Sequence, residues 1–420
     1  MKKIFIIAAV ILLTVFSFGE EKAAGKLLLK EGARLAVIGD SITEQKKYTR
    51  YMEMYFAGCY PSINIKQFQY GWSGEKASGF LGRMTNDLEL FKPDVATLCY
   101  GMNDGGYRAF DESLGKNYEK NLSKIVDKLK KQGVLVVISS PGAVDTKYYK
   151  GKAATPEVYN ETLKKFAEIA KKVADDNGMP FIDMHNLLME TMEKAKAVMG
   201  ADYDVCGRDG VHPGENGHVV MAYAFLKAMG FDGDIGTITM DVKGKATATA
   251  GHKIISPLGN KVIIESTRYP FCFEGNPKYS SSTSSILPFL PFNKELNRFT
   301  LIVNNLESPA AKVTWGKVTI TFKKEELEKG VNLAAEFPEN PFCEDFKNLE
   351  VEVATKQAYE TEIIKEYITK IPKMLKFPEP GQTKEEIIKE KDKEWAEWEG
   401  MLKNLPKIVV PVKHTITVSK

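Results

Sequence analysis

Short apolar runs alternate with helix-like segments through the first half of the chain. The helical spacing of apolar positions is clearest in Tyr118–Gln132 and Glu157–Asn177, and a closing helix is expected at Gly217–Met229. Continuous apolar strands separated by helices are typical of a parallel sheet covered on both faces. Residues 30–230 are therefore predicted to form one three-layer α/β domain. The five predicted strands are Arg34–Gly39, Ile63–Tyr70, Val95–Tyr100, Val134–Ser139 and Phe181–Met184.

After Gly230 the pattern changes to alternating apolar and polar residues, which predicts an antiparallel β unit resembling a small sandwich. This unit is assigned to residues 236–340 and 406–420. Residues 341–405 are rich in Lys and Glu at helical spacing, so we expect a helical insertion before the last strand. Its charge runs near Lys384–Glu399 are expected to be solvated helix faces. The strand-like segments are Thr237–Thr249, Lys253–Thr267, Thr300–Val303, Lys312–Phe322 and Ile408–Val418.

Composition fits a globular protein of two domains. The chain has 420 residues, of which 43% are hydrophobic and 27% are charged. The formal net charge of +3 is close to balanced, and no clustered basic face is indicated. A nucleic-acid partner is therefore not expected.

The N-terminus has the pattern of a secretory signal peptide, assigned to residues 1–19. Lys2 and Lys3 precede the apolar run Ile4–Phe18, and Gly19 is followed by two glutamates. An uncleaved membrane anchor is the alternative, but the run falls short of the roughly 20 residues that span a bilayer. The sequence thus predicts a secreted or periplasmic protein without stable membrane insertion after signal removal.

The cysteines form no C-x-x-C pair, and a chain of this size does not require a disulfide framework. Two readings stay open, namely a single bridge in an oxidising compartment or buried free thiols. The five cysteines are Cys59, Cys99, Cys206, Cys272 and Cys343.

The segment Gly39-Asp40-Ser41-Ile42-Thr43 follows the first predicted strand directly. Ser41 then sits where the strand turns into a helix, with its hydroxyl facing the crevice above the sheet. The glycine permits the tight turn, and the helix N-terminus favours negative charge nearby. Alone, the tripeptide Gly39-Asp40-Ser41 is weak evidence for a catalytic serine, because Ser after Asp is common in turns and helix caps.

Two further loops follow the second and third strands. Gly71-Trp72-Ser73-Gly74 offers a backbone N–H that could approach a substrate oxygen closely, and Gly101-Met102-Asn103-Asp104 offers the Asn103 amide. Together with the Ser41 N–H, these donors suit an oxyanion hole for acyl transfer. Trp72 is left with two readings, as a wall of the pocket or as packing beneath it. Asp40 and Asp104 are expected to brace their loops.

The segment Asp209-Gly210-Val211-His212-Pro213 precedes the last helix of the domain. Asp and His three residues apart can lie on one turn, where the carboxylate holds the imidazole tautomer. The other ring nitrogen then supplies the general base that a serine hydroxyl lacks. The remaining histidines, which lack such a context, are expected to be structural: His185, His218, His252 and His414.

These four blocks resemble those of the SGNH (GDSL-type) serine hydrolase family over about residues 30–230. The matching positions are Ser41, Gly74, Asn103 and His212, with Asp209 completing the triad. The resemblance implies a flavodoxin-like sheet of order 2-1-3-4-5, with Ser41 and Asn103 flanking its switch point. It also implies hydrolysis of acyl esters.

Export and the second domain favour a carbohydrate O-acetylesterase acting on an acylated carbohydrate or another small acyl ester. The alternatives are a lysophospholipase or thioesterase of the same family, and a relic glycan-binding protein that has lost catalysis. Ser280–Phe292 could stack on sugar rings or cover the pocket, but simple packing on its own domain is the favoured reading. Metal-binding and cofactor motifs are not found, so no cofactor is expected.

Overall fold

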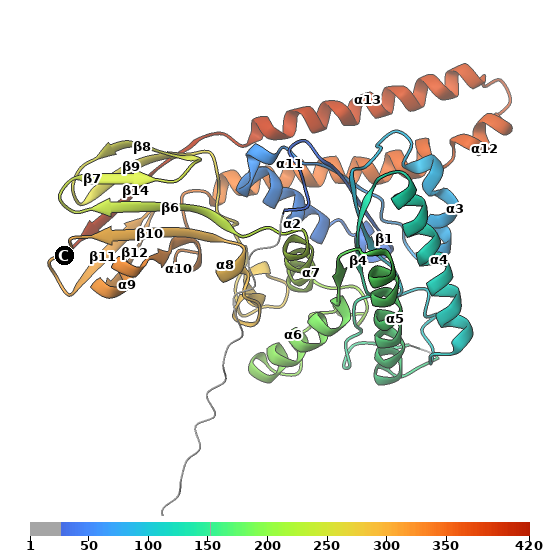
Figure 1. Cartoon of the computed structure of the whole chain (residues 1–420), viewed down its shortest axis with the longest axis horizontal. Helices are drawn as coiled ribbons and strands as arrows, with labels where there is room; N and C mark the ends of the chain where they lie inside the picture. The colour runs from blue at the N-terminus through green and yellow to red at the C-terminus, as the bar shows by residue number, and fades with distance from the viewer. Residues whose placement is uncertain (1–26, 152) are drawn as a thin grey trace, which may run out of the picture.

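The computed structural model describes residues 27–151 and 153–420, so the predicted signal peptide at 1–19 lies outside the described residues. An α/β domain and a β domain lie at opposite ends of the molecule (Figure 1). Two long helices run from the β domain across one side of the α/β domain. None of the helices in the described ranges combines the length and apolar character that a bilayer crossing requires.

The α/β domain is built on one parallel five-stranded sheet of order β2-β1-β3-β4-β5. This confirms the predicted fold class and strand order. The register places Ala36 of β1 between Phe68 of β2 and Ala96 of β3. The strands are β1 (Arg34–Gly39), β2 (Lys66–Gln69), β3 (Val95–Cys99), β4 (Leu135–Ser139) and β5 (Phe181–Ile182).

Helices cover both faces of this sheet, which explains why its strands are apolar along their whole length. Ala36 and Ile38 point into one apolar cluster, whereas Leu35 and Val37 point into another. The first cluster is closed by α3 (Ala77–Asp87), α4 (Glu112–Lys131) and much of α5 (Pro156–Asn177). The second is closed by α2 (Tyr48–Met54), α6 (Met184–Met199) and α7 (Glu215–Ala228).

The β domain consists of two sheets packed face to face, in agreement with the predicted sandwich. One sheet has the order β13-β10-β6-β7 and the other β12-β11-β14-β9-β8. Trp315, Phe299 and Leu301 are fully buried between them. The strands are β6 (Asp234–Asp241), β7 (Lys245–Ala248), β8 (His252–Pro257), β9 (Lys261–Ser266), β10 (Arg298–Asn304), β11 (Ala310–Trp315), β12 (Val318–Lys323), β13 (Val331–Asn332) and β14 (Val412–Ser419).

The expectation of a purely antiparallel unit is wrong at one place. Strands β6 and β10 pair in parallel, with Thr237 opposite Thr300 and Met240 opposite Val303. A parallel pair needs a long crossover connection, and here the chain between them first builds β7 to β9 and then a loop with short helices. The short helices are η3 (Thr283–Phe289) and α8 (Phe292–Glu295).

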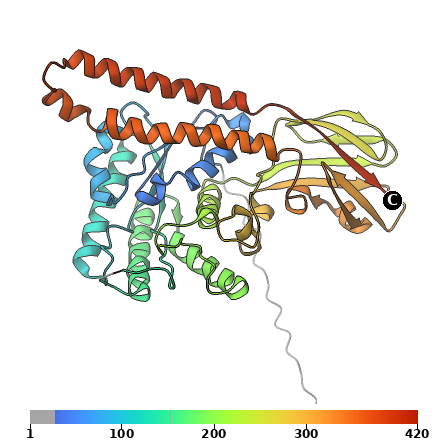
Figure 2. The same ribbon diagram turned by 180° about the vertical axis from the view of Figure 1, so that it is seen from behind.

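Helices α11 (Cys343–Glu362) and α13 (Lys384–Ile408) lie between β13 and β14 in sequence and side by side in space (Figure 2). They are joined by the π-helical turn η4 (Ile363–Ile368) and by α12 (Ile371–Lys376). We call these four elements the helical insertion. Its α11 packs on α2 and β2 of the α/β domain, and α13 packs on the outside of α11.

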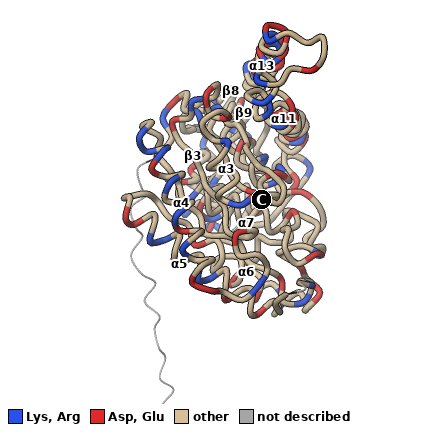
Figure 3. Tube along the Cα trace, turned by 90° about the vertical axis from the view of Figure 1, so that its right-hand side faces the viewer, with Lys and Arg blue, Asp and Glu red and all other residues tan. Residues whose placement is uncertain are grey.

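The surface of the insertion is mixed in charge. Within 384–399 most side chains are exposed or half-buried, as predicted, and Ile387 and Trp398 are the buried ones. Acidic and basic residues are interspersed along α13 and over the rest of the face in Figure 3. The remaining short helices are α1 (Ser41–Glu44), η1 (Tyr55–Cys59), η2 (Pro61–Ile63), α9 (Lys324–Lys329) and α10 (Leu333–Glu336).

Candidate active site

Ser41 is the first residue of α1 and follows β1 at the carboxyl edge of the sheet. Asp40 caps this helix, because its Oδ1 accepts a hydrogen bond from the Ile42 N–H at 3.0 Å. As the first helical residue, Ser41 has a backbone N–H without an intrahelical acceptor. The strand-to-helix turn therefore presents a hydroxyl and a free N–H at the same point.

The Ser41 hydroxyl contacts the imidazole of His212, with 2.7 Å between Oγ and Nε2. The opposite ring nitrogen, Nδ1, lies 2.6 Å from Oδ2 of Asp209. The Asp209 carboxylate accepts the Nδ1 proton, so the Nε2 atom is free to accept the serine proton. The structure thus brings together the three side chains that the sequence predicted as a triad.

Asp209 is held in place by the backbone of its own turn. Its Oδ1 accepts the N–H groups of Val211 at 2.8 Å and of His212 at 2.9 Å. Burial opposes ionisation, but the hydrogen bonds from the His212 backbone, the His212 ring and Val211 outweigh it. The pKa of Asp209 is lowered from its usual value as a result. The carboxylate is therefore ionised at neutral pH, as an imidazole-orienting group must be.

The loops after β2 and β3 carry the other predicted donors. Because β1 lies between β2 and β3, these loops flank Ser41 at the same edge of the sheet. Gly74 has φ +72°, and a Cβ atom there would meet open space. The left-handed backbone therefore selects glycine at this position, and the space beside it is free for a substrate. Within residues 27–151 and 153–420, no acceptor takes the Gly74 N–H.

The Asn103 amide is oriented by two contacts. Its Nδ2 donates to the Glu75 carbonyl oxygen at 3.2 Å, and its Oδ1 accepts the Tyr107 hydroxyl at 2.9 Å. This fixes which end of the amide is the donor and leaves its second N–H for a ligand. Tyr107 was not identified from the sequence. Its backbone has a left-handed conformation, at φ +55°, but this feature is visible only in the structure.

Two buried carboxyl groups lie behind the site and brace its loops, as expected. Asp104 accepts the Ala77 N–H at 3.1 Å, and Asp40 caps α1 as described. Burial raises the pKa of Asp40 to about 7 and that of Asp104 to about 6. Neither touches the Ser41 hydroxyl, so both have a structural role.

Two cations lie close to the Trp72 ring. The Arg83 guanidinium lies 4.9 Å from its ring centre, and the Lys365 ammonium lies 5.1 Å from it. Lys365 belongs to the helical insertion, and this contact could not be predicted from the sequence. Trp72 is not among the residues that line the cleft described next.

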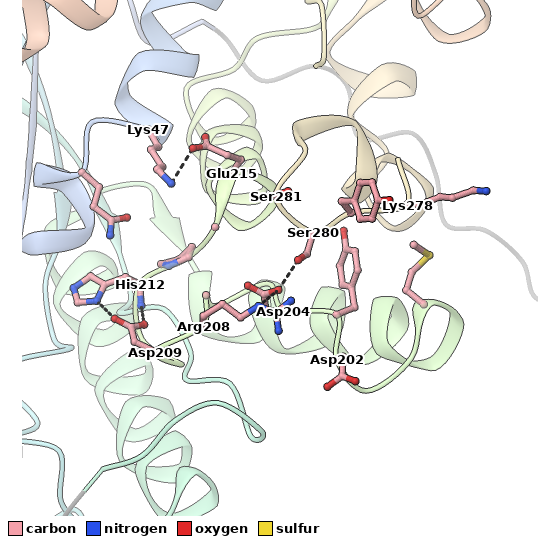
Figure 4. Close-up of a pocket in the computed structure, with 17 residues that line it drawn as sticks. Lys47, Asp202, Asp204, Arg208, Asp209, His212, Glu215, Lys278, Ser280 and Ser281 are labelled. Carbon is pink, nitrogen blue, oxygen red and sulfur yellow. Dashed lines mark hydrogen bonds and ion pairs between the residues drawn. The ribbon is translucent and has the colours of Figure 1, made fainter. Parts of the chain in front are cut away.

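A cleft of about 820 Å³ opens beside His212 and Asp209. It is lined by chain segments 199–215, 45–47 and 278–281, the last of which belongs to the long connection before β10. Figure 4 shows Lys47 and Glu215 on one side and Asp204 with Ser280 on the other. The Lys47–Glu215 pair is 2.8 Å apart. Charged and polar side chains line this cleft together with Met199, Tyr203, Pro213 and Tyr279.

The other histidines are structural, as predicted. His218 accepts the Tyr48 N–H at 3.3 Å, contacts Gln45 at 2.8 Å and stacks on the Tyr48 ring. His252 and His414 lie in the core of the β domain and His185 is buried in the α/β domain. In the described part of the chain, no group of three or more His, Cys, Asp or Glu side chains is arranged to hold a metal ion.

Comparison with known proteins identifies the class of this domain. The family model of the GDSL-like lipase/acylhydrolase family matches residues 37–220. An acetylxylan esterase from Geobacillus stearothermophilus is 25% identical over 226 residues, covering 48% of this chain and 95% of that protein. A solved structure, a gut microbial diltiazem-metabolizing enzyme, covers 93% of this chain and 98% of its own, with a TM-score of 0.72 and 23% identity.

The fold and the site define a three-layer α/β hydrolase that carries a serine at the end of its first strand. The α/β domain, over residues 37–220, belongs to the SGNH/GDSL family of hydrolases, and this match together with the esterase relative supports an acyl ester hydrolase. The likeness to the diltiazem-metabolizing enzyme extends over the β domain and the helical insertion as well, and it supports the fold of the whole described chain.

Proposed function

We propose that this protein is an exported serine esterase that removes acetyl groups from carbohydrates, with Ser41, His212 and Asp209 as its catalytic triad. The observation that carries the proposal is the pair of short contacts on the His212 ring. These are 2.7 Å from Nε2 to the serine oxygen and 2.6 Å from Nδ1 to the carboxylate. A serine hydroxyl is a weak nucleophile unless a positioned base removes its proton, and this arrangement supplies that base.

The reaction proceeds in two acyl-transfer steps. His212 takes the Ser41 proton as the oxygen attacks the ester carbonyl, and then gives it to the departing alcohol. Water attacks the acyl-enzyme in the same way and releases the acid. Asp209 holds the ring in the tautomer that both steps need.

The negative charge of each tetrahedral intermediate is stabilised by the N–H groups of Ser41 and Gly74 and by the Asn103 amide. One such donor is worth roughly 10²–10³ in rate. Preorganisation supports this assignment, because the Gly74 N–H has no acceptor among the described residues and the Asn103 amide is fixed by Tyr107.

A carbohydrate substrate is supported by the relative and by the cleft. The relative that matches the domain is an acetylxylan esterase. The residues that line the cleft beside His212 include Asp202, Arg208 and Lys278, whose side chains can form hydrogen bonds with the hydroxyl groups of a sugar. Tyr279 lines it with 62% of its surface exposed, which suits stacking on a sugar ring. Export is proposed from residues 1–19, whose charge and apolar run fit a signal peptide.

Acetate release from acetylated xylo-oligosaccharides by the mature protein tests this function. Ser41→Ala should lower the rate by at least about 10³-fold while leaving the unfolding temperature unchanged. Ser78→Ala, at an exposed position of α3, is the matched control and should keep full activity. Turnover by Ser41→Ala would remove Ser41 from the mechanism. A preference for long-chain acyl esters over acetylated sugars would instead defeat the carbohydrate assignment and favour a lipase-like activity.

A further inference from the structure

The loop that carries Gly74 lies between α1 and the helical insertion. Its first residue, Gly71, packs against the backbone of α1, because a Cβ there would stand 2.2 Å from the Glu44 nitrogen. No side chain larger than hydrogen fits that position. The loop therefore packs tightly against α1, the helix that begins with Ser41. We expect a displacement of the loop to displace α1 as well.

Glu44, the last residue of α1, holds this loop by a charge-assisted hydrogen bond. Its Oε2 accepts the Ser73 N–H, and its Oε1 receives the ammonium of Lys365. Burial of the carboxyl opposes ionisation, but these bonds outweigh it and lower the pKa of Glu44. The carboxylate is thus charged and holds the Trp72–Ser73 peptide, which is one unit before the peptide that carries the Gly74 N–H.

Lys365 also contacts the loop itself. Its ammonium lies 5.1 Å from the centre of the Trp72 ring, and Arg83 lies 4.9 Å from that centre. Arg83 is itself fixed by ion pairs with Glu75 at 2.8 Å and Asp87 at 2.7 Å. Trp72 therefore makes cation–π contacts with one cation of the α/β domain and one cation of the insertion.

A second route joins the insertion to the same loop. The Gln69 side chain accepts the Gly71 N–H at 3.0 Å and donates to the Thr361 hydroxyl at 2.7 Å. Thr361 stands on α11, just before the π-helical turn that carries Lys365. The wider turn shifts the helix register there, and such turns are frequent at functional sites.

We propose that Lys365 is a positioning residue for ester hydrolysis, which through Glu44 and Trp72 holds the Ser73–Gly74 peptide in the orientation that stabilises the oxyanion. This inference rests on the proposed function of Ser41 and Gly74. It assigns the helical insertion a part in the active site, although the insertion lies about 300 residues further along the chain (the Lys365–Glu44 separation is 321 residues). Its chemical role is to supply the charge that keeps Glu44 in place.

The test compares two variants. Lys365→Met keeps most of the apolar side chain but removes its charge, whereas Lys365→Arg keeps the charge. With a small acetyl ester, Lys365→Met should lower kcat about 10-fold to 100-fold, less than the loss of an oxyanion donor, with KM within about twofold of wild type. Phosphonylation of Ser41 by a fluorophosphonate should slow in the same proportion. The phosphoryl oxygen of the fluorophosphonate is stabilised by the same N–H groups that stabilise the oxyanion of the ester reaction. Lys365→Arg should restore most of both rates.

Lys370→Met is the matched control, because Lys370 lies on the insertion and pairs with Glu366 away from the loop. It should leave kcat and the phosphonylation rate unchanged. All rates are compared well below the unfolding temperature of each variant. Wild-type kcat and phosphonylation in Lys365→Met, or equal losses in the Met and Arg variants, would overturn the inference. If Ser41→Ala is inactive while Lys365→Met is unimpaired, only this inference fails; activity in Ser41→Ala would instead remove the proposed function itself.

Discussion

The Lys356 ammonium of α11 donates a hydrogen bond to the Gln67 carbonyl oxygen of β2, at 3.0 Å and 289 residues away in sequence. Strand β2 is an edge of the parallel sheet, so its outward backbone groups have no neighbouring strand. Glu360, one turn after Lys356, accepts the Gln69 N–H of the same strand at 3.1 Å. Two buried side chains of the insertion thus bond backbone groups of β2 that a sixth strand would otherwise pair with.

Removal of the Lys356 charge is expected to destabilise the protein strongly. Lys356 is 1% exposed and lies between the buried carboxylates of Glu53, at 2.9 Å, and Glu360. In Lys356→Met both carboxyl groups lose their counter-ion, which costs about 3–5 kcal/mol of unfolding free energy. Burial already raises the pKa of Glu53 to about 7. The loss should therefore be smaller at pH 5.5, which is below the pKa of Glu53, than at pH 8.

Urea unfolding at the two pH values measures this effect, with Lys370→Met as a surface control that should change the free energy by less than about 0.5 kcal/mol. A Lys356→Met variant as stable as wild type at pH 8 would show that the edge of β2 does not depend on the insertion.

Tyr107→Phe is expected to impair catalysis more than stability. The Asn103 Oδ1 loses its donor, so the amide can rotate away from the oxyanion, and kcat should fall about 10-fold. The lost hydrogen bond costs only about 1 kcal/mol of stability. Tyr223→Phe removes a similar hydroxyl contact, 2.8 Å from Glu295, away from the site and should leave kcat unchanged. Equal kcat values in the two variants would exclude an orienting role for Tyr107.

The sheet, and the three side chains of the proposed triad, could be predicted because their signals are local. The prediction of Arg34–Gly39 matches β1 at both ends, and Asp209 and His212 lie within one turn. The contacts of the insertion could not be predicted in this way. Lys356 and Glu360 have the composition of a solvated helix face, and only the position of β2, far away in sequence, makes them buried. The same holds for Lys365, whose partner Glu44 lies three residues after Ser41 in the chain.

The parallel pair of β6 and β10 was missed for a related reason. Alternation of apolar and polar residues indicates that a strand has one buried face, but it carries no information on the direction of its neighbour. Here the direction is set by the connection, which passes through three other strands and the segment that reaches the cleft.

Tyr279→Ala tests the carbohydrate part of the proposed function. If Tyr279 stacks on a sugar, its loss should raise KM for acetylated xylo-oligosaccharides about fivefold, equivalent to about 1 kcal/mol. A small acetyl ester that does not reach Tyr279 should be hydrolysed at the wild-type rate. Phe377→Ala removes another exposed aromatic ring, on the insertion, and is the control for both substrates. An unchanged KM for the oligosaccharides would show that the sugar does not contact Tyr279.

Cys343 is expected to be the most reactive of the five thiols, all of which are free. A hydrogen bond from the Cys272 thiol lowers the pKa of Cys343 to about 7, and the Asn340 N–H, at 3.5 Å, adds to the effect. Burial raises the pKa of Cys99 to about 12 and also raises the pKa values of Cys59 and Cys206. The hydrogen bond with Cys343, followed by burial, raises the pKa of Cys272.

Brief treatment of the folded protein with iodoacetamide at pH 7.5 should therefore modify one site, mapped by mass spectrometry to Cys343. Cys343→Ser should abolish this modification, whereas Cys59→Ser should leave it unchanged. Modification of a buried cysteine at a similar rate would contradict the ranking.

A chain of hydrogen bonds between the two sheets of the β domain makes its stability dependent on pH. Trp315 donates to His414 at 3.1 Å, so the other nitrogen of His414 carries the proton and donates to Ser266 at 2.9 Å. The Ser266 hydroxyl then donates to His252 at 2.8 Å, and His252 donates to the Ile235 carbonyl oxygen at 2.9 Å. The chain runs in one direction only while both imidazoles are neutral.

Burial lowers the pKa of His414 from 6.5 to about 3. Between these two values the unfolded chain binds a proton that the folded chain does not, so stability falls as the pH is lowered from about 6.5 towards 3. At pH 5, His414 alone should cost about 2 kcal/mol relative to pH 8. In His414→Gln, the amide can accept from Trp315 and donate to Ser266 without titrating. Its loss of unfolding free energy between pH 8 and pH 5, measured with urea, should therefore be smaller than that of wild type by about 2 kcal/mol. Equal losses in the two proteins would show that His414 does not control the acid sensitivity of the β domain.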